Sequence, residues 1–385
     1  MSVEHDADQP EFEFEEEKQQ RDEVLDNQNV EDDTEQEPHT TNRFSITSYG
    51  ADLSVFDLRR RLGNEILIPA PFQRKFVWSQ RQASRFIESI LLGLPVPGIF
   101  VYLKDKKQLI VDGQQRLITL DRFLSGVWEK RTRKQGGSVV EVSVPFTLLE
   151  VADPWAGKTF ADLEKDDRDE IENYLIHATI FRQDHPAKKD RSIYEVFERI
   201  NTGGLRLSNQ EIRACISHGS MVQKLDEIAA LPQWRSVYGK RSPRLKDEEL
   251  ILRFFALLKR HAAYKRPMRV FLDEYLEDEM DATSASLDEM KAIFLNTLAA
   301  LTAAIPDKLF RPETALNAAV FDAVMVGCAD RVSQGPVEDS AALRVAYLSL
   351  LNHEEFQKNY KRATADDESV KSRIRLAIEA FANLK

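Results

Sequence analysis

One stretch of the sequence combines polar side chains with a glycine in a pattern that suits a bound phosphate. It is LIVDGQQRLITLDRFL, residues 109–124, and it opens with a short apolar, β-branched run typical of a buried strand. From Gln114 onward the apolar residues recur at helical spacing, so the chain should pass from a strand through a tight turn into a helix. Such a turn presents free backbone N–H groups and the positive end of the helix dipole. The polar residues and the glycine at this turn are Asp112, Gly113, Gln114, Gln115 and Arg116.

Each of these residues has a chemistry that a phosphate site would use. Gly113 lets a ligand approach the backbone closely, and the amides of Gln114 and Gln115 add hydrogen-bond donors. Arg116 carries a planar cation suited to phosphate, and Asp112 could hold a metal ion or orient a water. A purely structural interpretation is also open, because Asp112 and Gln115 fit a capping box and Arg116 could be a surface cation.

A second stretch, IPAPFQRKFVWS at residues 68–79, joins polar residues to aromatic ones. Gln73 and Arg74 follow a proline-shaped turn, and the aromatic residues Phe76 and Trp78 come after them. Taken singly, aromatic residues beside bases are most simply explained by packing.

A third stretch, VFERINTGGLRLSNQEIR at residues 196–213, contains a Gly-Gly turn before a predicted helix. Arg199 and Asn201 precede the turn, and Ser208 and Glu211 form a capping-box pattern beyond it. A glycine-rich turn before a helix can hold phosphate, although a structural turn explains the same residues.

Together and in this order, the three stretches resemble a known family. IPAPFQRKFVW, VDGQQRLITL and FERINTGGLRLSNQEIR are similar to the N-terminal domain of GmrSD-type restriction endonucleases, over about residues 44–216. The resemblance implies an α+β fold of the ParB and sulfiredoxin type with a small mixed sheet. It also implies nucleoside triphosphate hydrolysis that supports DNA nicking or cleavage in restriction or phage defence.

The resemblance further implies roles for individual residues. Asp112, Gln115 and Arg116 would be the catalytic or phosphate-binding residues, and Asp112 would place Mg²⁺ or another divalent cation. The other residues expected to bind the nucleotide are Gln73, Arg74, Gly113, Gln114, Arg199 and Asn201.

The sequence departs from the family at its C-terminal end. Many family members carry a second nuclease domain of the His-Asn-His type there, and no such pattern is present. Of the seven histidines, only His261 and His353 lie beyond residue 218, and neither sits in a ββα-metal pattern. DNA cutting would therefore need a partner subunit or an unrecognised site in the first domain.

The net charge of −11 is unevenly distributed along the chain. Residues 1–42 contain 16 acidic and two basic residues, which leaves 51 basic and 48 acidic residues in the remainder. The low pI therefore does not argue against nucleic-acid binding by the body of the protein. Residues 1–43 are expected to be a disordered acidic tail. A sharper hypothesis is that EFEFEEE, residues 11–17, mimics a nucleic-acid backbone and occupies a basic groove of the same protein.

Periodicity predicts two folded domains after the tail, an α+β domain at 44–217 and an all-α domain at 218–385. The resemblance implies that the first of them binds a nucleotide. Ser79 and Gln82 form a capping box for a helix in the first domain, and residues 129–137 read as an exposed basic loop. Strands are expected at 98–104, 109–111, 139–149 and 176–181, the first two as a hairpin, and helices at 55–62, 160–174 and 192–200. Helices of the second domain are expected at 247–263, 285–304, 313–333, 340–352 and 366–383.

Basic residues cluster at 130–134, 235–246 and 259–269, with Tyr238 and Tyr264 interleaved. A solvated face is the simplest explanation of such clusters. The alternative is a surface that contacts DNA backbones without reading their sequence, with an affinity that falls steeply as salt rises.

Composition restricts the remaining function classes. No run of 18 apolar residues exists, and the acidic N-terminus lacks the apolar core of a signal peptide. Cys215 and Cys328 form neither a zinc spacing nor a disulfide framework. A reducing cytoplasm is therefore the expected location.

The sequence thus favours a nucleoside-triphosphate-binding and hydrolysing protein that acts on DNA, directly or through a nuclease partner. A homo-oligomer is a further open possibility. The alternative is a non-catalytic module that binds DNA or protein and is switched by the nucleotide. Turnover discriminates between the two, because only the first predicts hydrolysis that Asp112→Ala abolishes.

Overall fold

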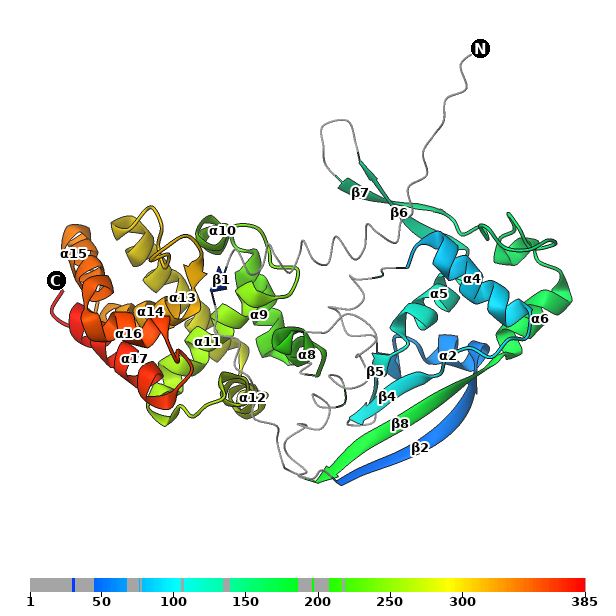
Figure 1. The fold of residues 1–385 in the computed structure, drawn as a ribbon, viewed down its shortest axis with the longest axis horizontal. Coiled ribbons are helices and arrows are strands. Elements are labelled where there is room, and N and C mark those ends of the chain that lie inside the picture. Colours follow the sequence, from blue (N-terminus) through cyan, green and yellow to red (C-terminus); the bar gives the residue numbers. More distant parts are fainter. Residues whose placement is uncertain are drawn as a thin grey trace, which may run out of the picture. The chain divides into compact units, whose positions relative to one another are not determined.

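The computed structural model shows two compact units, whose bodies are residues 42–206 and 207–385 (Figure 1). The residues that it describes are 30–31, 45–67, 76, 78–104, 107–133, 139–185, 196, 208–216 and 219–384. The first unit mixes strands and helices, whereas the second is almost entirely helical. The α+β fold class predicted from the sequence is therefore confirmed.

A five-stranded mixed sheet forms the frame of the first unit, in the order β2-β8-β4-β5-β3. The pairs β2/β8 and β4/β5 are antiparallel, and the pairs β4/β8 and β3/β5 are parallel. The β4/β5 pair is the hairpin that the sequence predicted. The strands are β2 (Ser45–Ser54), β3 (Ile66–Leu67), β4 (Ile99–Lys104), β5 (Lys107–Asp112) and β8 (Leu175–His185).

Helices lie along one side of this sheet (Figure 1). They are α2 (Val55–Arg61), α4 (Gln80–Leu91), α5 (Gln114–Ser125) and α6 (Lys165–Asn173). The predicted capping box of α4 is confirmed, because the Ser79 hydroxyl accepts from the Gln82 N–H and the Gln82 side chain accepts from the Ser79 N–H. The apolar face of α4 is buried, and each fully buried side chain such as Ile87 or Ile90 contributes roughly 1.5–3 kcal/mol.

Two expectations for the first unit are wrong. Part of the predicted basic loop is strand β6 (Val127–Arg133), which pairs antiparallel with β7 (Val139–Pro145). The valine-rich β7 supplies a partner strand, and Trp128 anchors the ribbon by packing against Phe146 at a ring distance of 4.8 Å. The helix predicted at 160–174 is divided, because extended backbone at Leu163 and Glu164 separates a 3₁₀ turn from α6.

The second unit is a bundle of ten helices in its described part. Its core is organised around α14, which is buried over almost its whole length. Gly327 allows α17 to approach closely, because a Cβ there would lie 2.6 Å from the carbonyl carbon of Ala377. The helices are α8 (Asn209–Ile216), α9 (Ser220–Ala230), α10 (Pro232–Tyr238), α11 (Lys246–Arg260), α12 (Met268–Asp278), α13 (Ser284–Ala304), α14 (Ala318–Val332), α15 (Ser340–Asn352), α16 (Glu354–Lys361) and α17 (Asp367–Phe381).

One short segment of the acidic N-terminal region is part of the described structure. Strand β1 (Val30–Glu31) pairs in parallel with β9 (Leu316–Asn317), the single strand element of residues 219–384. The disorder predicted for residues 1–43 otherwise falls outside the described residues, as does the acidic stretch 11–17 that was considered a nucleic-acid mimic.

Two further observations concern apolar and thiol groups. Within the described residues, no helix combines the length and apolar character needed to cross a membrane. Cys328 is fully buried in α14, and burial raises the pKa of its thiol to about 12. Cys328 is therefore a small core side chain rather than a reactive thiol.

Candidate nucleotide site at the β5–α5 turn

The turn between β5 and α5 has a conformation that requires glycine. Strand β5 ends at Asp112, and Gly113 precedes the helix with a left-handed φ of 95°. A Cβ at Gly113 would also lie 2.5 Å from Cγ2 of Ile99, so two independent constraints exclude a side chain. The helix start is therefore pressed against β4, and Gly113 itself is buried.

The structure does not contain the capping box that offered a structural explanation for this turn. The residue before α5 is Gly113, and no side chain caps the helix there. Asp112 belongs to β5 and its carboxylate points to a different partner. The first turn of α5 thus retains the amide groups and dipole that can bind an anion.

That partner is Arg116, which ties the turn together. Nη2 of Arg116 donates to Oδ2 of Asp112 over 2.8 Å and to the Gly98 carbonyl over 2.7 Å. The Arg116 side chain is 14% exposed and that of Asp112 is 38% exposed. These two hydrogen bonds hold the guanidinium in place. The Asp112 carboxylate remains partly accessible to solvent.

The two glutamines of the turn have different surroundings. Oε1 of Gln115 accepts from the backbone N–H of Trp78 over 3.3 Å, which joins the turn to the end of the second sequence stretch. Oε1 of Gln114 is buried and has no hydrogen-bond partner among the described residues. Gln115 therefore fixes the neighbouring segment, whereas Gln114 has a polar atom to spare.

Four residues of the predicted site lie outside the described residues. They are Gln73, Arg74, Arg199 and Asn201. The capping box beyond the third stretch is confirmed, because Glu211 N–H donates to the Ser208 hydroxyl and Ser208 N–H donates to the Glu211 carboxylate.

The one carboxylate of the turn, that of Asp112, limits how the site could bind a metal ion. No group of three or more His, Cys, Asp or Glu side chains in the described part of the chain could hold a metal ion. Asp112 is a single carboxylate beside a cation, so it cannot form an all-protein cage. Mg²⁺ fits such a site, because it is commonly bound by one or two carboxylates together with substrate phosphates and waters.

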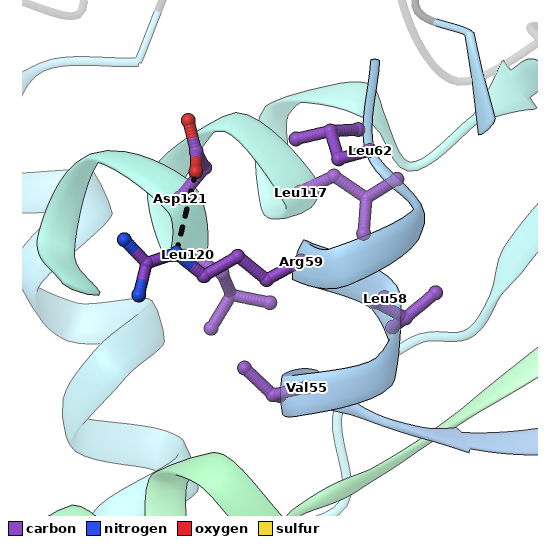
Figure 2. A pocket seen from close by; sticks show the side chains of 7 residues that line it. All are labelled: Val55, Leu58, Arg59, Leu62, Leu117, Leu120 and Asp121. Atoms are coloured by element: carbon purple, nitrogen blue, oxygen red, sulfur yellow. Dashed lines mark ion pairs between the residues drawn. The ribbon is translucent and has the colours of Figure 1, made fainter. Parts of the chain in front are cut away.

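A small hollow lies between α2 and α5, as Figure 2 shows. Its charged groups, Arg59 and Asp121, face each other at 3.6 Å and neutralise one another. The remaining lining is aliphatic, so the hollow lacks the donors that a phosphate needs. The aliphatic residues are Val55, Leu58, Leu62, Leu117 and Leu120.

The basic clusters of the helical unit are mostly paired with acids. Arg235 lies 2.7 Å from Asp247, and Arg241 lies 2.7 Å from both Asp226 and Glu248. Further pairs are Arg244–Glu211, Lys259–Glu279, Arg260–Asp278 and Arg266–Asp366. Because their charges are locally compensated, these residues do not form the single-sign surface that a DNA backbone would need.

One of these acids gives the helical unit a pH-dependent stability. Burial, and next the neighbouring charge of Asp247, raise the pKa of Glu248 to about 7, although Arg241 opposes the shift. Between pH 4.5 and 7 the folded protein therefore keeps a proton that the unfolded chain has lost. We expect the free energy of unfolding to fall by roughly 1–3 kcal/mol across this window, and Glu248→Gln to remove that fall.

Denaturant unfolding at pH 5 and pH 7.5 measures this effect. The exposed Glu354→Gln, at the start of α16, is the matched control and should keep the wild-type pH dependence. The prediction is wrong if the free energies of unfolding of wild type and Glu248→Gln differ by the same amount at both pH values.

Comparison with known proteins finds one family match, and it includes this site. Residues 53–217 match the family described as the GmrSD restriction endonuclease, N-terminal domain. The matched residues include the β5–α5 turn, and the match confirms the resemblance seen in the three sequence stretches. No curated protein and no solved structure matches the chain.

The sequence did not bring together a second polar pair that the sheet creates. Asp52 of β2 and His177 of β8 are 125 residues apart and become direct cross-strand partners. The alternation of exposed and buried residues in β8 places His177 on the exposed side of its strand, but its partner depends on strand order.

Proposed function

We propose that the first unit binds a nucleoside triphosphate with Mg²⁺ at the β5–α5 turn and hydrolyses it. The observation that carries this proposal is the left-handed Gly113 at an uncapped helix start, flanked by the Asp112–Arg116 pair. The match of residues 53–217 to a restriction endonuclease family supports coupling of this activity to DNA, in restriction or phage defence.

The proposal gives each residue of the turn a task. Amides of the first turn of α5, with Gln114, bind phosphate oxygens, and Arg116 supplies positive charge from a fixed position. Asp112 orients the attacking water or binds Mg²⁺, whose chemistry is to neutralise developing phosphate charge. Gln115 holds the neighbouring segment in place through Trp78.

Four more residues enter through the family resemblance. Gln73 and Arg74 would line the same pocket, and Arg199 and Asn201 would form its third wall. The resemblance also implies the nucleotide-binding fold of ParB and sulfiredoxin for this unit.

Nucleotide binding by the full-length protein tests the proposal directly. Fluorescent analogues of ATP, GTP and CTP, titrated with and without Mg²⁺, should show saturable binding of at least one nucleotide. Competition by the unlabelled triphosphate but not by its nucleoside would place the recognition on the phosphates. Absence of binding for all three would contradict the proposed site.

The β6–β7 ribbon is the surface that we propose for DNA. Its backbone carries Lys130, Arg131 and Arg133 along β6, and a two-stranded ribbon fits the major groove of DNA. We expect replacing these three residues by alanine to weaken binding of duplex DNA roughly 10-fold or more and to reduce the salt dependence of the affinity.

The matched control replaces three exposed bases at the end of α16, Lys358, Lys361 and Arg362, by alanine. Fluorescence anisotropy at several salt concentrations measures both variants. Equal affinities and salt slopes for wild type and the β6 variant would locate the DNA surface elsewhere.

A second candidate function is a nucleotide-switched binding module without turnover. The engagement of Asp112 by Arg116 favours it. Saturable nucleotide binding without phosphate release, in the presence and absence of DNA, would select this alternative.

A further inference from the structure

A second pair of ionisable side chains lies at the same end of the sheet as the β5–α5 turn. Nδ1 of His177 is 2.8 Å from Oδ1 of Asp52, and these side chains are 60% and 63% exposed. A carboxylate at this distance holds the imidazole with Nδ1–H as the donor, so Nε2 is left as a proton acceptor. This is the arrangement of an oriented general base.

Two glycines accommodate His177 in this position. A Cβ at Gly50 would lie 2.6 Å from Cε1 and 3.1 Å from Nε2 of the imidazole, so the ring lies directly over the backbone of β2. A Cβ at Gly98 would lie 2.5 Å from the His177 carbonyl oxygen. The ring is thus positioned by Asp52 at one end and by the bare backbone of Gly50 beneath it.

Strand directions bring this pair to the turn. Because β2 and β5 run antiparallel to β8 and β4, the ends that carry Asp52 and Asp112 meet the beginnings of β8 and β4. The register aligns Asp112 with Phe100 and Phe100 with Thr179, and His177 lies two residues from Thr179. At ~4.8 Å per strand, Asp112 and Thr179 are about 10 Å apart.

A continuous set of contacts links the two pairs. Asp52 contacts His177, the His177 backbone abuts Gly98, and the Gly98 carbonyl accepts from Arg116. The turn is therefore joined, through the Gly98 carbonyl and the His177 backbone, to the strand that carries the imidazole.

We propose that His177 is the general base for hydrolysis of the bound triphosphate and that Asp52 orients it; this role rests on the proposed function. Nε2 accepts a proton from a water whose oxygen bonds to the terminal phosphorus. The bond from that phosphorus to the bridging oxygen breaks, and nucleoside diphosphate and inorganic phosphate leave. The proton on Nε2 then passes to solvent, so the imidazole returns to its starting state.

The test measures kcat for phosphate release and nucleotide Kd separately in full-length variants. We expect His177→Gln to lower kcat ~100-fold or more with Kd within ~3-fold of wild type, because general bases contribute 10²–10⁴-fold. Asp52→Asn should lower kcat roughly 10-fold or more through loss of orientation. Gly50→Ala should also lower it, since the new Cβ displaces a histidine that is still present.

His185→Gln is the matched control, because His185 is an exposed histidine at the other end of β8. It should leave kcat unchanged. Wild-type kcat in His177→Gln, with hydrolysis by the wild type intact, would overturn the role of His177 and leave the proposed function standing. Failure of the wild type to bind or hydrolyse any triphosphate would overturn both.

Discussion

We expect Asp322→Asn to lower the free energy of unfolding of the helical unit by ~3–5 kcal/mol, the cost of removing one partner from a buried ion pair. Asp322 is fully buried in α14 and binds two buried arginines. Nε and Nη2 of Arg253 donate to its two carboxylate oxygens, over 3.2 Å and 2.7 Å, and Nη2 of Arg373 donates over 3.2 Å.

The physical reason is that two buried arginines, Arg253 and Arg373, share the negative charge of Asp322. Burial lowers the pKa of Arg373, and Asp322 opposes this shift. Asparagine has the same shape but no charge, so both buried guanidinium groups would lose the negative charge of Asp322. The network also spans α11, α14 and α17, so its loss should affect the whole unit cooperatively.

Denaturant unfolding followed by helical circular dichroism measures this effect. Asp278→Asn is the matched control, because it removes an exposed pair with Arg260 and should cost no more than about 1 kcal/mol. Equal unfolding midpoints for the two variants would show that Asp322 does not stabilise the core through its charge.

The second large effect concerns Arg116. We expect Arg116→Ala to weaken nucleotide binding roughly 10- to 150-fold, the equivalent of ~1.5–3 kcal/mol for a lost hydrogen bond to a charged group. Arg116→Lys should also bind weakly, because lysine keeps the charge but lacks the further planar N–H groups with which a guanidinium can bind phosphate while Nη2 stays on Asp112 and the Gly98 carbonyl.

Arg59→Ala controls for the loss of a cation from the same unit. Arg59 lies on α2, is 41% exposed and pairs with Asp121 rather than with the turn. The Arg59→Ala protein should bind the nucleotide with the affinity of the wild type. Unchanged affinity in both Arg116 variants, with thermal unfolding as a check on their folding, would remove Arg116 from the site.

Local pattern predicted the elements that build the candidate site. The β4–β5 hairpin, the strand-turn-helix passage at Gly113 and the capping boxes at Ser79 and Ser208 depend on residues close in sequence. The β6–β7 ribbon was missed because polar and basic residues in β6 carry little strand signal, and its stability comes from β7 and from Trp128.

Long-range pairing accounts for the rest of what the sequence did not predict. The acids that neutralise the basic clusters can be distant, as with Arg266 and Asp366, which are 100 residues apart. Asp112 pairs with Arg116 and does not cap α5, because Gly113 has a left-handed φ and because Gly98 lies where Arg116 can reach it. Neither the charge balance of a surface nor the partner of one carboxylate follows from periodicity.

Phosphate release is the measurement that tests the central proposal most directly. The full-length protein would be incubated with ATP, GTP or CTP and Mg²⁺, with and without duplex DNA, beside Asp112→Ala. We predict release from at least one triphosphate by the wild type and none by Asp112→Ala, which should still bind the nucleotide. Equal release by both proteins, or none by the wild type under any condition, would contradict hydrolysis at the β5–α5 turn.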